Sequence, residues 1–165
     1  MSTFVLVAGL TFLFVFGAAL GMRPSPRQAQ LARLRAAATA RGLRVRVAPA
    51  TPGGQISPNL VVYVLSWRLE QLEQARELRF QAVLEPSGGW RAQAPPGLEQ
   101  EQLIGILGDL PAGVTELTAV ADGLAARWDE RGAEHEVERL AAALVTLREA
   151  CLGGGNRSSP AQGRT

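Results

Sequence analysis

The chain has 165 residues, among them 17 arginines, 15 acids, one histidine and one cysteine, and it contains no lysine. The single cysteine, Cys151, excludes an internal disulfide bond. One histidine and one cysteine also exclude a metal site built from these ligands within one subunit. The abundance of arginine, alanine and glycine is typical of a GC-rich bacterial genome. About 125 residues lie between an apolar start and a polar tail, which is the length of one domain.

Charge is unevenly distributed along the chain. Residues 1–69 hold eight arginines and no acid, whereas residues 70–165 hold nine arginines and all fifteen acids. The high isoelectric point therefore comes from the front of the chain. The basic segment lacks interleaved aromatic residues and a glycine-rich loop, so we do not expect nucleic acid as a partner.

The first part of the chain has the pattern of a membrane anchor. Residues 3–22 read TFVLVAGLTFLFVFGAALGM and carry no charged side chain. About 20 apolar residues in a helix cross a hydrocarbon core of roughly 30 Å. A cleaved signal peptide is the alternative. Such a peptide has a positively charged N-terminal region and an A-x-A cleavage site, and Ala18-Ala19-Leu20-Gly21 matches that site poorly. We therefore predict a retained transmembrane anchor over residues 1–22.

The orientation of this anchor follows from the basic residues beside it. Arginines follow the apolar segment closely and no basic side chain precedes it, so the positive-inside rule predicts an outer N-terminus and a cytoplasmic domain. The predicted location is the bacterial inner membrane. The same arginines are expected to contact anionic lipid headgroups: Arg23, Arg27, Arg33, Arg35 and Arg41.

A basic juxtamembrane helix is predicted within residues 23–42. Ser25 is a suitable N-cap, Pro26 suits the first helical position, and Gly42 suits the position after the last turn. The helix is expected from about Pro26 to Arg41, and only a narrow apolar stripe runs along it.

The first half of the next segment predicts strands. Residues 43–47 alternate between apolar residues and arginine, and residues 60–67 form a continuous apolar run, so both are read as strands around a loop at 49–58. Residues 68–78 contain strong helix formers and predict a short helix, although the preceding strand could extend into them. Residues 79–84 and 90–93 predict two further short strands.

The second half predicts a helix, a hairpin and a final helix. Leucine and isoleucine recur at helical spacing between Glu99 and Leu110, and Asp122-Gly123 is a strong hairpin signal between residues 114–121 and 124–128. A single apolar face predicts a helix from about Ala133 to Leu152. We therefore expect a cytoplasmic α+β domain over residues 43–152, with a mainly antiparallel sheet and helices packed on one face, before a disordered tail at 153–165.

No residue pattern identifies an active site. The chain lacks phosphate-binding, dinucleotide-binding, metalloprotease and serine-hydrolase motifs, so no catalytic residue, cofactor or metal is assigned. Asp129, Glu130 and Arg131 follow Trp128 at a strand-to-helix junction. They fit a polar turn that begins a helix. Together with Trp128 they also mark a candidate partner surface or, less readily, an acidic site beside an aromatic wall. The three tryptophans, Trp67, Trp90 and Trp128, are expected in the core or on the sheet.

One known family shares part of this layout. The single N-terminal apolar span, the exit Arg23-Pro24-Ser25-Pro26-Arg27 and a basic helix that leads into strands together resemble the small auxiliary subunit of the bacterial preprotein translocase. The resemblance covers about the first third of the chain. The family's valine-threonine-glycine-glycine strand motif is absent, and Thr51-Pro52-Gly53-Gly54 stands there instead, so the chain is not assigned to the family.

These patterns favour a non-enzymatic accessory or adaptor protein that binds a protein partner at the cytoplasmic face of the membrane. A membrane-tethered enzyme of unknown reaction is the first alternative, since acids such as Asp129 and Glu130 could form a site in the fold. A protein that binds anionic lipids is the second alternative, and it depends on the arginines beside the anchor.

Overall fold

The computed structural model describes residues 3, 5, 7–13, 25–47 and 61–153. The chain divides into two compact units, residues 1–32 and 33–165. In the first unit residues 7–13 are helical. Among the residues that the structure describes, no helix combines the length and the hydropathy that crossing a bilayer requires. Residues 14–22 of the predicted anchor, the predicted loop at 49–58 and residues 154–165 of the predicted tail lie outside the described residues.

The order of helices and strands agrees with the order expected from the sequence. The elements are α2 (Pro26–Ala40), β1 (Leu43–Val47), β2 (Val61–Ser66), the 3-10 turn η1 (Leu69–Gln71), α3 (Leu72–Glu77), β3 (Gln81–Leu84), β4 (Trp90–Ala92), α4 (Gln100–Gly108), β5 (Val114–Val120), β6 (Gly123–Trp128) and α5 (Glu134–Gly153). The ambiguous residues 68–78 are helical, in two short pieces.

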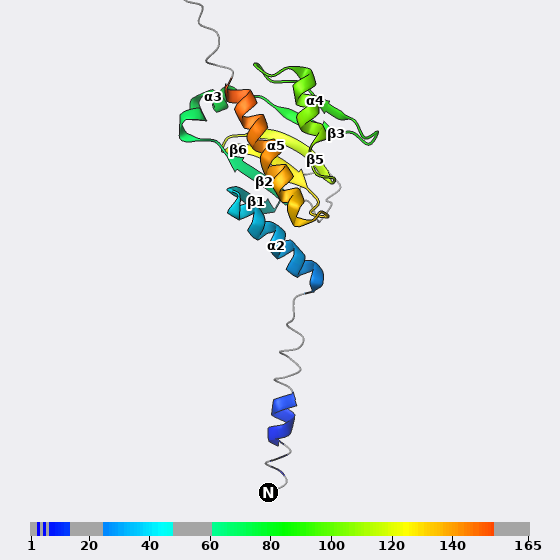
Figure 1. Ribbon diagram of the computed structural model, residues 1–165. Coiled ribbons are helices and arrows are strands. Elements are labelled where there is room, and N and C mark those ends of the chain that lie inside the picture. The colour runs from blue at the N-terminus through cyan, green and yellow to red at the C-terminus, as the bar shows by residue number, and fades with distance from the viewer. Residues whose placement is uncertain (1–2, 4, 6, 14–24, 48–60, 154–165) are drawn as a thin grey trace, which may run out of the picture. The chain divides into compact units, whose positions relative to one another are not determined.

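The strands form one antiparallel sheet of six strands in the order β1-β2-β6-β5-β3-β4 (Figure 1). The predicted α+β class and the antiparallel sheet are therefore confirmed. β2 pairs with β6 although about 60 residues separate them in the chain, and Tyr63 lies opposite Ala126 in that register. This pairing brings the front of the domain beside its last strand.

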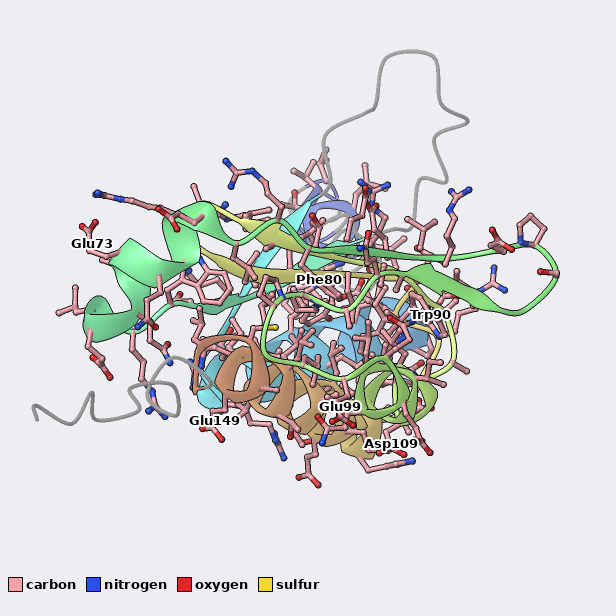
Figure 2. The ribbon with its side chains drawn as sticks, turned by 90° about the horizontal axis from the view of Figure 1, so that it is seen from above. Glu73, Phe80, Trp90, Glu99, Asp109 and Glu149 are labelled. Atoms are coloured by element: carbon pink, nitrogen blue, oxygen red, sulfur yellow. The ribbon has the colours of Figure 1, made fainter. Side chains whose placement is uncertain are left out.

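Helices α4 and α5 lie on the same side of the sheet (Figure 2). Because side chains alternate along a strand, one face of the sheet meets these helices. That face carries residues that are at most 1% exposed: Tyr63, Ala82, Leu117, Leu124, Ala126 and Trp128. Leu140, Leu144 and Leu147 of α5 are fully buried as well, so the core lies between α5 and the sheet.

The second half of α2 belongs to the domain core. Leu34, Ala37 and Ala38 are buried, and the compact unit starts at Arg33, ahead of the predicted domain start at residue 43. Gly42 follows the helix with a φ of +78°, where a residue with a side chain would be strained. The helix therefore ends where the sequence predicts, and its last turns pack with the domain.

Two of the three tryptophans are buried, as expected for core residues. Trp67 donates a hydrogen bond from Nε1 to the carbonyl oxygen of Val120 at 2.9 Å, and Trp128 donates to Ala112 at the same distance. Trp90 is half-buried on the edge strand β4. Each buried indole thus has a partner for its N–H group.

Candidate functional site

A buried carboxylate lies at the junction between β6 and α5. Glu130 is 2% exposed and accepts three hydrogen bonds. Arg35 of α2 donates from Nε to Oε1 at 2.9 Å and from Nη2 to Oε2 at 2.7 Å. Tyr63 of β2 donates its hydroxyl proton to Oε1 at 2.6 Å. The side chains of a helix, a strand and a loop therefore converge on one acid; we call these three residues the Glu130 network.

Trp128 completes one wall of the network. Its ring lies 5.6 Å from the Tyr63 ring, centroid to centroid, at an interplanar angle of 58°. A tilted arrangement at this distance is favourable for aromatic pairs. The Tyr63 ring packs against Trp128, and its hydroxyl group donates to Glu130.

The loop backbone explains why Glu130 turns inward. Glu130 has a φ of +55°, a left-handed conformation that costs a residue with a side chain about 1–2 kcal/mol. Its neighbour Asp129 accepts a hydrogen bond from the Arg131 N–H at 3.1 Å and donates its own N–H to Gly113 at 3.2 Å. These two hydrogen bonds of Asp129 fix the turn, and the Glu130 side chain within it reaches Arg35.

The start of α5 is fixed in a similar way. Glu136 accepts a hydrogen bond from the N–H of Ala133 at 2.7 Å, which satisfies a donor that the helix leaves without a partner. Gly113 packs directly against the Asp129 side chain, because a Cβ atom there would lie 2.1 Å from Oδ1. The loop from β6 to α5 is thus bonded at both ends.

The electrostatics of the network favour an ion pair with two protonated donors. Burial, followed by the hydrogen bond to Glu130, raises the pKa of Tyr63. The hydrogen bond to Glu130 raises the pKa of Arg35. Both groups therefore keep their protons and donate hydrogen bonds to the Glu130 carboxyl group. The arrangement binds the second half of α2 to the sheet.

The predicted partner surface is divided between core and surface. Trp128 and Glu130 are buried, and Glu130 has a left-handed backbone conformation. Asp129 and Arg131 remain at the surface, with side chains 22% and 78% exposed and an ion-pair distance of 3.4 Å. A partner can reach these two residues without unfolding the loop.

The predicted lipid-contact arginines are also divided. Arg35 and Arg41 pair with Glu130 and Glu138, so part of their charge is used within the domain. Arg27 and Arg33 are exposed and have no ion-pair partner among the described residues. Arg23 lies outside the described residues.

Within the described residues there is no group of three or more histidine, cysteine or acidic side chains that could hold a metal ion. Burial raises the pKa of the half-buried Cys151 thiol to about 11, which keeps it protonated at neutral pH.

A surface groove of about 250 Å³ lies between α4 and α5, lined by Ile106, Asp109, Arg139, Ala142, Ala143 and Thr146.

Sequence reasoning did not identify Tyr63 or Arg35 as partners of Glu130. One signal was available: a tyrosine inside an apolar run needs a hydrogen-bond acceptor for its hydroxyl group. The sequence does not say which acid supplies that acceptor, because residues 63 and 130 meet only through the pairing of β2 with β6.

Comparison with known proteins gives no relative. No family model, no curated protein and no solved structure matches this chain.

Proposed function

We propose that this chain is a membrane-anchored accessory protein of a bacterial inner membrane. In this proposal residues 1–22 cross the bilayer with the N-terminus outside, and the folded unit binds a protein partner on the cytoplasmic side. The uncharged segment 3–22, followed directly by arginines and no acid before Glu70, supports the anchor and its orientation.

The exposed Arg131 and the partly exposed Asp129 carry the proposal of a partner surface. These charged side chains lie on a loop whose backbone is held by Gly113 and by the Glu130 network beneath it. Binding sites on rigid supports lose less conformational entropy when a partner docks. A charge pair on a rigid loop, with the arginine exposed, suits recognition of a protein surface with complementary charge.

Affinity capture of the full-length chain from mild detergent tests this proposal. The wild type should retain a stoichiometric partner that residues 1–22 fused to an unrelated domain do not retain. Arg131→Glu should reduce the retained amount several-fold, because it reverses a charge that is 78% exposed. Arg91→Glu is the matched control: its side chain is 74% exposed beside Glu85 on a different part of the sheet. A wild-type chain that elutes alone would refute the adaptor function.

Lipid binding is a second candidate, favoured by Arg27 and Arg33. Each arginine near an anionic surface contributes about 1 kcal/mol, so replacing both by glutamine should weaken vesicle binding of a chain lacking residues 1–22 by about 30-fold. Arg44 and Arg46 provide the control, because both pair with Asp122. Equal vesicle binding by the two double variants would exclude this candidate.

A further inference from the structure

Arg148 of α5 is a buried arginine with few partners. It is 7% exposed, and its Nη1 donates one hydrogen bond, to the carbonyl oxygen of Ser66 at 3.1 Å. Its Nε is buried and has no acceptor among the described residues. Buried polar groups are nearly always hydrogen-bonded, and an orphaned donor on a buried cation calls for an acceptor.

Arg35 shows which acceptor fits this edge of a guanidinium group. The Nε and Nη2 atoms of an arginine lie on one side of the planar group and match the two oxygens of a carboxylate. In Arg35 both atoms bind the carboxylate of Glu130. In Arg148 the bond to Ser66 uses Nη1, on the other side, so the edge that Arg35 uses has no bond within the described chain.

The charged groups around Arg148 do not pair with it directly. The neighbouring cation is Arg68, and the neighbouring acids are Glu149 and Glu70. Glu149 lies 3.8 Å from Arg68 rather than pairing with Arg148. Burial, and then the charge of Arg68, lowers the pKa of Arg148, so that its positive charge is held at a cost. No acid makes a direct ion pair with Arg148 in the described part of the chain.

We propose that the Nε and Nη2 edge of Arg148 is a binding site for a carboxylate group, with Arg68 as the second cation at its entrance. A single carboxylate matches the planar edge in shape and carries one negative charge, and the nearby Ser66 carbonyl oxygen disfavours a more highly charged anion. The side chains of Arg68 and Glu149 are 53% and 57% exposed. The carboxylate belongs to an aspartate or glutamate of the partner, a statement that rests on the proposed adaptor function.

Acetate is the probe for the site itself. The full-length chain, labelled with ¹⁵N-arginine in maltoside micelles, is titrated with sodium acetate against sodium chloride at equal ionic strength. The Nε–H signal of Arg148 should shift along a saturable curve in acetate only. Arg139 is the internal control, because it lies on the same helix, is exposed and bonds a backbone carbonyl, that of Asp109, at 3.0 Å. An Arg148 shift no larger than that of Arg139 would overturn the site.

Two variants separate binding from folding. Arg148→Lys removes the bidentate edge and should abolish the saturable acetate response. If this buried variant does not fold, Arg68→Gln decides, because the Arg68 side chain is exposed and its replacement should weaken acetate binding about tenfold without unfolding the domain. Acetate affinity that is unchanged in Arg68→Gln refutes the role of Arg68 at the entrance.

The source of the carboxylate is tested separately by partner capture. Loss of the captured partner in Arg68→Gln, with Arg139→Gln unaffected, supports a carboxylate on the partner. Capture that is unchanged in Arg68→Gln, despite a saturable acetate response, refutes the partner as the source and assigns the site to a small free carboxylate. Failure of acetate to bind overturns the site alone, since capture by the wild type still decides the adaptor function.

Discussion

Replacement of Glu130 by glutamine tests whether the Glu130 network holds α2 to the sheet. Glutamine has the same size, but it places an NH2 group where the carboxylate accepts the Arg35 proton at 2.7 Å. The variant loses one charge-assisted hydrogen bond, and its buried NH2 group faces the N–H donors of Arg35. Such losses cost about 1.5–3 kcal/mol each. Because the Arg35 side chain is 41% exposed and can be hydrated, we expect a loss of about 2 kcal/mol.

The free energy of unfolding is measured by urea denaturation, followed by the fluorescence of the buried tryptophans. A loss of this size lowers the melting temperature of a domain of this length by about 6–10 °C. Glu138→Gln is the matched control: it also removes an acid that pairs with an arginine, Arg41 just after α2, but this acid is 60% exposed, so the change should stay below about 0.5 kcal/mol. If Glu130→Gln costs no more than Glu138→Gln, the network does not stabilise the fold as described.

Three further predictions follow from the same region and from α5. Tyr63→Phe should cost about 1 kcal/mol in urea denaturation, since one hydrogen bond to a buried acceptor is lost while the ring stays against its neighbour; an unchanged midpoint would contradict the 2.6 Å bond. Gly113→Ala should cost about 3 kcal/mol, because φ is +87° and the new methyl group meets Asp129, whereas Gly88→Ala, at φ +89° in open space, should cost about 1 kcal/mol; equal melting temperatures would argue against the close approach. Cys151 should react slowly with iodoacetamide at pH 8, because a pKa raised from 9.0 to about 11 reduces its thiolate fraction about 100-fold, and a rate equal to that of a free thiol would contradict its burial.

Local signals explain why the order of elements was predictable. The residues around Gly42 predict a helix end, and the structure has a left-handed glycine there. The alternation in residues 43–47 and the Asp122-Gly123 turn predict strands from neighbours in sequence. Each of these features depends on a few adjacent residues, so the order of helices and strands can be predicted from the sequence.

The position of β6 between β2 and β5 depends on contacts between distant segments, and no local pattern encodes it. The same limit applies to the candidate site. Glu130 stands between two other charged residues and resembles any polar turn, and its burial follows from one left-handed backbone angle and from distant donors. Arg148 is one of several charged residues in the final helix, and it shares the buried face with Leu144 at a spacing of four residues.

The membrane anchor is tested most directly by alkaline carbonate extraction of bacterial membranes that contain the full-length chain. We expect the wild-type chain to stay in the membrane pellet. Leu10→Arg combined with Leu13→Arg should release it, because each arginine near the centre of a span costs about 2.5–3.5 kcal/mol. A wild-type chain that appears in the carbonate supernatant would contradict the proposed anchor, and with it the placement of the domain at the cytoplasmic face of the membrane.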